Sequence, residues 1–489
     1  MSILSSIHET LGIPTMLIFT TVFLLSLWIV TRRQKYSNLP PGPRPLPFIG
    51  NLLLLIKTPS TYKLFHELAQ QYGGIFTIWF GSQCTIVLSN VDTLREAFVK
   101  NGEVLGGRPR GKTSEELTGY NGITANDGES WRVLRKFSLL SLRNFGVGKN
   151  SMELETRIQD ETKWLQTEIS GYKGEPFDIA ELFNKAVSNV ICSICFGERF
   201  DYNDGTFKKL LHMLDFFFAH GGPRTGSRKM WKQVVENDRA IKRFVKEKIE
   251  EHRKTYSGDT IRDFVDLYIQ AEENEEDKTH LTEENVFQLI VDLFEAGTET
   301  TKTSLTWGVL HMTQHPHIQD KCHKELEIVF DKDHIPSAGD RLKMPYTEAT
   351  VYELQRCANI APVTIPHRAQ EATSVGGYII PAEAMIFGNL FSVHMDKEYW
   401  ENPSAFNPDR WIKNGMVIKH ENFMPFGIGR RICLGKDLAK MELIIMFSAL
   451  MQRFSFKLPD GAVADMEGVQ GMTLTPKPFK VCAIDKYLS

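Results

Sequence analysis

Apolar residues recur at helical spacing through most of the chain, which predicts a protein built mainly from α-helices. The longest such stretch, residues 282–315, would extend about 50 Å at a rise of ~1.5 Å per residue, enough to cross a whole domain. Thr282 is its predicted N-cap, and Pro316 closes it. The predicted helices span residues 151–170, 179–196, 233–256, 260–275, 282–315, 317–330, 347–357 and 434–454.

Strand-like alternation of apolar and polar positions is less common. Residues 75–89 and 376–393 are predicted hairpins because turn residues divide their apolar runs, and residues 479–484 are a predicted edge strand. No internal repeat or further linker follows Asn51. The pattern therefore predicts a mainly α fold with small β-sheets, in a single domain over residues 52–489.

Polar residues interrupt the longest predicted helix at its centre. Phe294 and Leu305 indicate that this helix is buried, yet the stretch EAGTETT (295–301) places glycine and hydroxyl side chains in its middle. Glycine and threonine are mediocre helix formers, and a hydroxyl competes for backbone hydrogen bonds. Such a stretch is typical either of a functional site or of a water-filled packing defect.

The N-terminal segment 13–31 carries no charge and has about the length of a helix that spans a bilayer. A cleaved signal peptide is the alternative, but it would place basic residues before a shorter apolar run. Here Arg32, Arg33 and Lys35 follow the run. We therefore expect a signal anchor over residues 1–35 with the remaining chain in the cytosol. The proline-rich residues 36–51 would form a stiff hinge behind it.

Charge and cysteine content exclude two classes of protein. A net charge of −3 and a pI near 6.6 give no reason to expect a nucleic-acid partner. The seven cysteines are scattered and odd in number, which is typical of a reducing compartment and not of a disulfide scaffold. Cys192 and Cys195 form a C-x-x-C pair, but their apolar neighbours favour core thiols over a redox or metal pair.

A single cysteine, Cys433, stands in the glycine- and arginine-rich stretch FGIGRRICLGK (426–436). It precedes the predicted helix 434–454, so the helix dipole and the adjacent arginines favour its thiolate. A thiolate can serve as a nucleophile or a metal ligand. No cysteine or histidine nearby completes a zinc site, and a catalytic histidine would have to come from elsewhere in the fold. One thiolate with an apolar platform and cations suits an axial ligand of haem iron.

The stretch FGIGRRICLG matches at every fixed position the signature Phe-Gly-x-Gly-x-Arg-x-Cys-x-Gly of the cytochrome P-450 family, and the chain resembles this family over essentially its whole length. It is most similar to the microsomal family-two enzymes of animals. The resemblance implies the cytochrome P-450 fold with haem b as cofactor. Cys433 would be the proximal iron ligand, in a loop that includes Gly429 and Gly435. Phe426 would pack beside the sulfur, and Arg431 would contact a haem propionate.

The same resemblance assigns further residues to the haem. Trp131 and Arg135 in WRVLR match the family's Trp-x-x-x-Arg and would also meet propionates. Arg108 in GGRP and His367 in IPHR resemble additional propionate contacts. Taken singly, each arginine is more simply interpreted as a surface cation, and the alternative for Trp131 is an ordinary core residue.

Glu353 and Arg356 in YELQR are three positions apart and would face one way on a helix. Such a pair is common on protein surfaces and is worth little there. In the family the pair joins an arginine of a Pro-x-Arg segment, here Arg410 in FNPDRW. The resemblance implies a structural network that supports the haem-side loop.

The stretch AGTET (296–300) resembles the family's oxygen-activation motif, in which Glu299 and Thr300 would be the acid–alcohol pair that delivers protons. Ala296 and Val363 are expected to line the substrate pocket. Glu295 has two interpretations: it faces the haem cavity and orients a cationic or hydroxylated substrate, or it faces a neighbouring helix and pairs with an Arg or Lys.

The resemblance implies a monooxygenase that inserts one atom of dioxygen into a small lipophilic substrate such as a fatty acid, a steroid or a xenobiotic. A haem-thiolate isomerase or dehydratase, and a non-catalytic membrane haem carrier or sensor, are the alternatives. Because the chain has no flavin or nicotinamide fingerprint of its own, electrons would come from NADPH through a flavoprotein reductase. Cytochrome b5 is a candidate second electron donor. The expected location is the endoplasmic reticulum membrane, in contact with lipid.

Two surface features bear on these expectations. Five cations on the expected thiolate side would form a basic docking face for an acidic reductase, although solvated cations are the plainer interpretation; they are Lys136, Arg143, Arg430, Lys436 and Lys440. Residues 207–232, which would roof the substrate pocket, make a shorter segment than is typical of family-two members.

Overall fold

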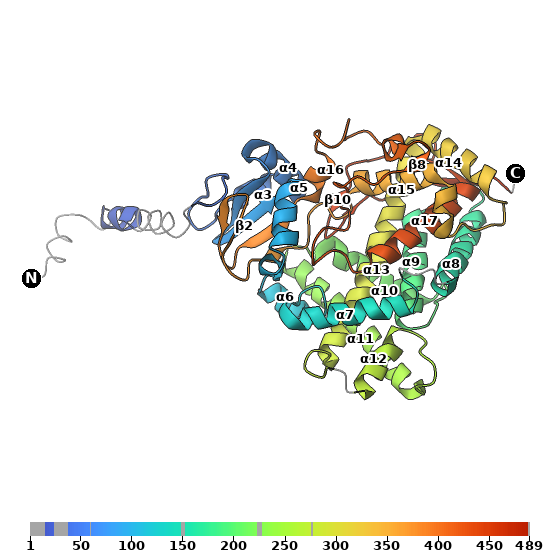
Figure 1. Ribbon diagram of the computed structural model, residues 1–489, viewed down its shortest axis with the longest axis horizontal. Helices are drawn as coiled ribbons and strands as arrows, with labels where there is room; N and C mark the ends of the chain where they lie inside the picture. The colour runs from blue at the N-terminus through green and yellow to red at the C-terminus, as the bar shows by residue number, and fades with distance from the viewer. Residues whose placement is uncertain are drawn as a thin grey trace, which may run out of the picture. The chain divides into compact units, whose positions relative to one another are not determined.

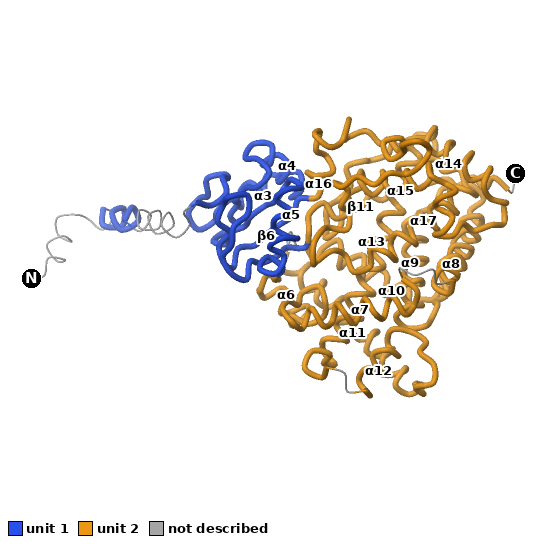
Figure 2. Tube along the Cα trace, viewed as in Figure 1, with its two compact units in different colours: residues 1–106, 365–389 blue, residues 107–364, 390–489 orange. Residues whose placement is uncertain are grey.

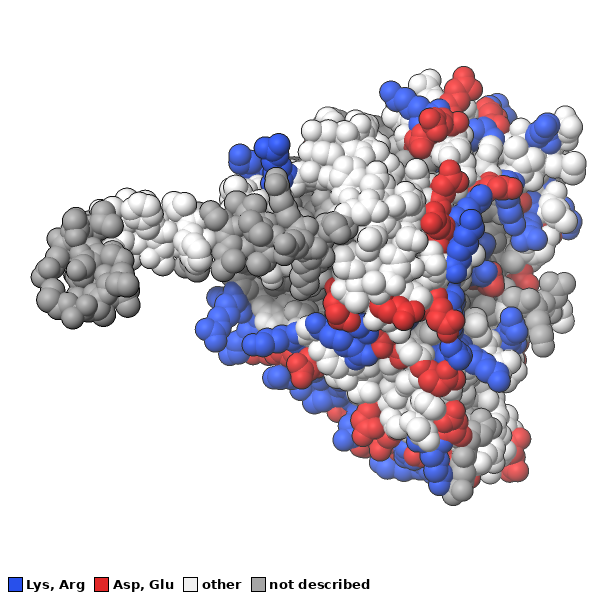
Figure 3. Space-filling model, turned by 60° about the vertical axis from the view of Figure 1, so that its left-hand side comes forward, with Lys and Arg blue, Asp and Glu red and all other residues white. Residues whose placement is uncertain are grey.

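The computed structural model describes residues 15–23, 38–58, 60–147, 152–222, 227–274 and 277–487. The chain forms two compact units, unit 1 from residues 1–106 and 365–389 and unit 2 from residues 107–364 and 390–489 (Figure 2). Basic and acidic side chains are interspersed over the face shown in Figure 3, in keeping with the net charge of −3.

Unit 1 contains short helices and one four-stranded sheet. Its elements are α3 (Leu52–Lys57), α4 (Thr61–Tyr72), β1 (Ile75–Phe80), β2 (Gln83–Leu88), α5 (Val91–Arg95), η1 (Glu96–Lys100), η2 (Val104–Gly106), β3 (His367–Arg368), β4 (Thr373–Val375), β5 (Tyr378–Ile380) and β6 (Met385–Gly388). The strand order is β1-β2-β6-β3, with β2 and β6 parallel. Ile75 pairs with Leu88 across the antiparallel β1–β2 hairpin, so the hairpin predicted over residues 75–89 is confirmed. The ring of Phe65 in α4 lies 5.6 Å from that of Phe387 in β6, which places the core of unit 1 between helix and sheet.

The proline-rich segment is tied to the first strand of this sheet. The backbone N–H and the hydroxyl of Thr77 donate to the carbonyl oxygens of Pro41 and Pro40, both at 2.8 Å. A Cβ at Gly42 would lie 1.9 Å from the Thr77 carbonyl oxygen, so only glycine permits this approach. The described part of the predicted hinge is therefore fixed along β1.

The hairpin predicted over residues 376–393 is wrong. β5 pairs with β4 and not with β6. Gly376 and Gly377, with φ of +58° and +78°, form the tight turn between β4 and β5 that only such backbone angles allow. Pro381 follows β5 and cannot donate to a strand ladder, and residues 390–394 are helical.

Unit 2 is largely helical, and its small sheets have two strands each. Its elements are α6 (Lys112–Thr118), α7 (Gly128–Asn144), α8 (Met152–Gly171), α9 (Ile179–Cys195), α10 (Gly205–His220), α11 (Arg228–Thr255), α12 (Phe264–Glu273), α13 (Glu283–Gln314), α14 (Pro316–Val329), η3 (Gly339–Lys343), α15 (Pro345–Ala358), α16 (Leu390–His394), η4 (Pro408–Trp411), β7 (Ile412–Lys413), β8 (Met416–Val417), α17 (Lys436–Arg453), β9 (Phe454–Lys457), β10 (Val469–Gln470), β11 (Leu474–Thr475) and β12 (Cys482–Asp485). The predicted mainly α fold with small sheets is confirmed.

Helix α13 passes through the middle of unit 2 (Figure 1). Its predicted N-cap is confirmed, because the Thr282 hydroxyl accepts from the backbone N–H of Asn285 at 3.3 Å. The predicted helices each have a counterpart, although α11 begins earlier than expected, where Ser227 caps it. Helix α10 was not predicted, although its buried apolar residues follow helical spacing, and Asp204 caps it through the N–H of Phe207. The predicted edge strand is confirmed as β12, which pairs with β9.

The predicted membrane span, residues 13–31, lies partly outside the described residues. Residues 15–23 are helical, with Leu17, Phe19 and Phe23 exposed. In the part of the chain that the structure describes, no helix has both the length and the apolar character needed to cross a bilayer.

Candidate functional site

The cysteine loop joins residue 426 to helix α17. The backbone N–H of Cys433 donates to the carbonyl oxygen of Phe426 at 3.0 Å and so closes the loop. Gly427 and Gly429 have φ of +73° and +78°, a backbone conformation that favours glycine. Gly435 has an ordinary φ of −86° and is the N-cap of α17. The loop therefore presents the thiol just ahead of a helix N-terminus, as predicted.

The Cys433 side chain is exposed, whereas the following helix is buried on all sides from Glu442 to Gln452. Desolvation by the surrounding protein raises the pKa of the thiol, while the Gly435 N–H and the charge of Arg135 act to lower it. The positive groups expected to favour the thiolate therefore do so, and desolvation opposes them. A bound metal ion would deprotonate the thiol directly.

A cluster of arginines surrounds Trp131, which is buried in α7. The guanidinium of Arg431 lies 3.9 Å from the centre of the Trp131 ring, and those of Arg135 and Arg430 lie at 5.6 and 6.0 Å. Arg135 also donates to the carbonyl oxygen of Ile432 at 2.7 Å, which ties α7 to the cysteine loop. The structure thus brings together Trp131, Arg135 and Arg431, three of the predicted propionate contacts.

The electrostatics of this cluster favour anions. Burial, followed by repulsion from Arg108, lowers the pKa of Arg431 to about 8. Burial lowers the pKa of Arg108 to about 10, against the opposing charge of Asp127. Burial also lowers the pKa of Arg135. Carboxylates placed among these cations would relieve their mutual repulsion.

Residues 123–126 link the arginine cluster to α13. Arg431 donates to the carbonyl oxygen of Asn126 at 2.8 Å, and Arg108 donates to that of Thr124 at 2.9 Å. The backbone N–H groups of Ile123 and Thr124 donate in turn to Asp292 of α13, at 2.8 and 2.9 Å. Asp292 was missed from the sequence, where an aspartate in an otherwise apolar helix was the available signal.

His367, the remaining predicted propionate contact, belongs to unit 1. Its Nδ1 lies 2.9 Å from the carbonyl oxygen of Leu105, and its ring lies 4.2 Å from that of Phe98.

One face of α13 is accessible at the centre of the helix. Ala296 is exposed and Leu293 and Thr300 are partly exposed, whereas residues 301–312 are all buried. These three positions follow helical spacing and so share a face. The Thr300 hydroxyl donates to the Ala296 carbonyl oxygen at 2.8 Å. Val363, the other predicted pocket residue, is half-buried in the segment after α15.

Glu299 lies on a different side of α13 from Thr300. Its carboxylate accepts hydrogen bonds from Lys302 at 2.5 Å, from Thr303 at 3.0 Å and from Thr473 at 3.1 Å. The structure does not bring Glu299 and Thr300 into a direct hydrogen bond. Lys302 and Thr473 were missed from the sequence, although a lysine within a buried apolar helix was a signal for the first.

Glu295 is buried at 9% exposure, and the charges nearest to it belong to Asp238, Asp292 and Lys242. Asp238 and Lys242 belong to α11, so Glu295 faces this neighbouring helix. Lys242 pairs with Asp238 at 3.1 Å and donates to the Leu117 carbonyl oxygen. Among the described residues, Glu295 Oε1 has no hydrogen-bond partner, so the expected bond to an Arg or Lys is not made.

Glu353, Arg356 and Arg410 form one buried network. Arg356 donates to both carboxylate oxygens of Glu353, at 2.7 and 2.9 Å, and Arg410 donates to Glu353 at 3.0 Å. Trp411 adds a further hydrogen bond to Glu353 at 2.9 Å. Burial alone would raise the pKa of Glu353, but the hydrogen bonds from Arg356 lower it below its usual value. Because Arg356 and Glu353 are both fully buried, this is not the surface pair considered above.

Comparison with known proteins decides the family. The chain matches the family model described as Cytochrome P450 over residues 40–483. It belongs to the cytochrome P450 family. Cytochrome P450 2U1 of Rattus norvegicus is 38% identical, over 93% of this chain and 92% of the relative. Cytochrome P450 2J2 of Homo sapiens is 37% identical over 96% of each chain, and Cytochrome P450 2B15 of Rattus norvegicus is 37% identical over 96% and 98%.

As a cytochrome P450, the protein is a monooxygenase that uses haem iron, and the residues present fit that group. The exposed Cys433 supplies a thiol ligand, and the arginines around Trp131 provide charge for carboxylates. The accessible face of α13 at Ala296 and Thr300 leaves room for a flat partner and a substrate. The similarity to Cytochromes P450 2U1, 2J2 and 2B15 confirms the resemblance to family-two members.

Proposed function

We propose that this cytochrome P450 inserts one atom of dioxygen into a small lipophilic substrate, a fatty acid, a steroid or a xenobiotic. The observation that carries the proposal is the exposed Cys433 thiol in a loop that Arg135 ties to the arginine cluster. Bound there, haem b would supply dioxygen activation and thiolate-assisted cleavage of the O–O bond. Cys433 would be its metal ligand, and Arg108, Arg135 and Arg431 would hold its carboxylates.

The remaining residues of the site act on substrate and protons. Ala296 and Val363 would line an apolar substrate pocket. Glu295, which faces α11, would lie outside that pocket. The Thr300 hydroxyl, on the accessible face of α13, would hold a proton at Oγ1 close to the reacting dioxygen. Glu299 would supply that proton from the other side of the helix. Glu353, Arg356 and Arg410 would keep the haem-side loop in place.

Electrons would come from NADPH through a flavoprotein reductase, with cytochrome b5 as a second donor. The proposed docking face comprises Lys136, Arg143, Arg430, Lys436 and Lys440. Lys136 and Arg143 are exposed on α7. Burial and repulsion by Lys419 lower the pKa of Lys440, which supports a local excess of positive charge. Such a face would steer an acidic partner, and the steering would weaken as salt is added.

The N-terminal segment would anchor the protein in the endoplasmic reticulum membrane, with the two units in the cytosol. Within residues 15–23, the hydroxyls of Thr20 and Thr21 donate to the carbonyl oxygens of Met16 and Leu17 at 2.8 and 2.7 Å. These bonds satisfy the polar groups inside the helix, as a lipid environment requires.

Reconstitution with a purified NADPH-dependent flavoprotein reductase under isotopically heavy dioxygen tests the function. We expect each product molecule to gain one heavy oxygen atom, and the rate of iron reduction to fall with added salt. Rearrangement of a peroxide substrate without reductase or dioxygen would instead show an isomerase. Haem binding without substrate-dependent NADPH consumption would show a haem carrier. A salt-insensitive reduction rate would overturn the docking face alone.

A further inference from the structure

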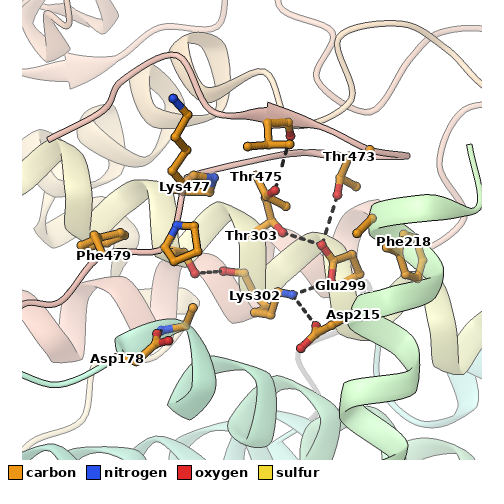
Figure 4. A pocket seen from close by; sticks show the side chains of 17 residues that line it. Asp178, Asp215, Phe218, Glu299, Lys302, Thr303, Thr473, Thr475, Lys477 and Phe479 are labelled. Carbon is orange, nitrogen blue, oxygen red and sulfur yellow. Dashed lines mark hydrogen bonds and ion pairs between the residues drawn. The ribbon is translucent and has the colours of Figure 1, made fainter. Parts of the chain in front are cut away.

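A cavity of about 240 Å³ lies beside Glu299 in unit 2 (Figure 4). Its walls come from the N-cap of α9, from α10, from α13 and from the segment after β10. Side chains of both signs line it, and the labelled acidic groups include Asp178 and Asp215. The cavity therefore borders the one carboxylate of α13 that the proposed function uses, and charged side chains stand among its apolar walls.

A three-membered ion cluster holds Glu299 at this cavity. Lys302 lies one turn further along α13, and its ammonium donates to Glu299 Oε2 at 2.5 Å and to Asp215 Oδ1 at 2.8 Å. Lys302 is only 9% exposed, and Glu299 is 2% exposed. A lysine so deeply buried beside Glu299 fixes the rotamer of that carboxylate, because loss of the contact leaves desolvated charges. Asp215, whose side chain is 41% exposed, holds the other side of the ammonium.

The outer members of this cluster are themselves anchored. Asn184 of α9 donates to Asp215 Oδ2 at 2.9 Å. Thr473, which donates to Glu299 Oε1, lies between β10 and β11, and Trp307 of α13 donates to the carbonyl oxygen of Leu474 at 2.8 Å. A Cβ at Gly471 would lie 2.5 Å from the Phe218 carbonyl oxygen, so glycine permits this turn to pack against α10. Glu299 therefore takes hydrogen bonds from α13 and from the β10–β11 turn, and Lys302 connects it to Asp215 of α10.

We propose that Lys302 and Asp215 are positioning residues that hold the Glu299 carboxylate toward this cavity, from which it takes up the protons of the monooxygenase reaction. The inference rests on the proton-supplying role proposed above for Glu299. In the reaction one atom of dioxygen enters the substrate, and the other leaves as water with a pair of protons and a pair of electrons. A proton from solvent would reach Glu299 through water in the cavity, Glu299 would pass it to the reaction, and a second solvent proton taken up the same way would restore Glu299 for the next transfer.

The two positioning residues shift the pKa of Glu299 in opposite directions. Burial raises the pKa of Glu299, Lys302 lowers it through charge and hydrogen bonding, and Asp215 raises it. A neutral residue in place of Lys302 would therefore raise the pKa further. A neutral residue in place of Asp215 would lower it. If the two residues acted on Glu299 only by excluding water, their neutral variants would not shift its pKa in opposite directions. Opposite shifts therefore distinguish a charge cluster from simple packing.

The test follows the protonation of Glu299 by infrared spectroscopy with ¹³C-labelled glutamate, using Glu299→Gln to identify its band. We expect Lys302→Met to move the pH midpoint of Glu299 protonation upward by about 1–3 pH units and Asp215→Asn to move this midpoint downward. Lys302→Arg should keep the wild-type midpoint. The matched control is Lys185→Met, which removes another well-buried lysine from an ion pair with Glu181 and should leave the Glu299 midpoint unchanged.

Coupling of NADPH consumption to product is the second readout. Lys302→Met should lower the fraction of electrons recovered in product severalfold and raise the solvent isotope effect. The Lys302→Met/Glu299→Gln double variant, which carries no unpaired buried charge, shows whether the fold survives. Unmoved midpoints in both Lys302→Met and Asp215→Asn would overturn the positioning role. Full coupling in Glu299→Gln would instead overturn the proton role of Glu299, whatever the midpoints show.

Discussion

Burial governs the protonation of several carboxyl groups in unit 2, and Glu442 shows the effect most simply. Its side chain is 1% exposed in α17, and it accepts one hydrogen bond, from Thr301 at 3.1 Å. Desolvation raises the pKa of Glu442 to about 8, with only that hydrogen bond opposing it. The folded protein therefore holds a proton on Glu442 at neutral pH that the unfolded chain releases.

Glu442→Gln tests this protonation. Because the folded pKa lies above the unfolded one, the stability gained from the bound proton is full below about pH 4.5 and is lost as the pH rises through about 8. The glutamine variant lacks this dependence. Between about pH 4.5 and 8 we expect the free energy of unfolding of the variant, relative to that of the wild type, to rise by roughly 5 kcal/mol. Urea titration at several pH values measures this difference. Parallel pH profiles for the two proteins would contradict a protonated Glu442.

At the scale of elements, buried ion pairs join helices to the segments around them. Glu353 and Arg356 on α15 reach η4 through Arg410, and Arg356 also donates to the carbonyl oxygens of His394 and Pro403 at 2.9 and 2.7 Å. The network therefore fixes α15, α16 and the chain before η4 relative to one another.

Arg356→Met leaves Glu353 charged and buried, so we expect a loss of about 3–5 kcal/mol in the free energy of unfolding, measured by chemical denaturation. Arg132→Met is the control, since Arg132 pairs with Glu129 at the same spacing while both side chains are more than half exposed. That substitution should cost about 1 kcal/mol or less. Equal losses in the two variants would show that the α15 network is no more important than a surface pair.

The junction of α11 and α12 carries a pH-dependent contact. His252 Nε2 lies 2.8 Å from Asp263 Oδ2, and His252 Nδ1 lies 2.7 Å from the Lys248 carbonyl oxygen. Burial lowers the pKa of His252, but the hydrogen bond and charge of Asp263 raise it more, against a smaller repulsion from Arg262. Asp266, the remaining acidic neighbour, is held by Arg262 through bonds of 2.6 and 2.7 Å.

His252→Gln should remove a stabilising contribution that is greatest at acidic pH. With a raised folded pKa, that contribution is full below the unfolded value of about 6.5 and disappears as the pH rises through the folded pKa. The destabilisation caused by the substitution should therefore shrink on going to alkaline pH, as urea titrations at several pH values would show. A destabilisation that is constant with pH would mean that His252 stays neutral.

At the scale of the whole molecule, the features that could be predicted from the sequence are those that depend on neighbouring residues in the chain. Helix α13 and its Thr282 cap follow from apolar spacing and a capping residue, and the cysteine loop follows from its glycines. Contacts between distant segments were not predictable. Asp215 and Lys302 are 87 positions apart, and nothing in the stretch EAGTETT shows that Glu299 faces α10.

The pKa values were equally out of reach from sequence, because they depend on desolvation. The positive groups around Cys433 suggested a thiolate and do act to lower the pKa of the thiol, but the sequence did not show that desolvation by the surrounding protein raises it. The pairing of β4 with β5 likewise depends on the Gly376–Gly377 turn, which the strand pattern alone did not locate.

The central claim is that Cys433 ligates haem iron, and the most direct test is the absorbance difference spectrum of the dithionite-reduced, carbon-monoxide-bound protein beside Cys433→Ala. We expect a strongly red-shifted Soret band in the wild type that is lost in the variant, because an anionic sulfur ligand is required for it. A band at the position typical of an imidazole ligand in the wild type, or a well-folded wild-type protein that binds no haem, would contradict the account.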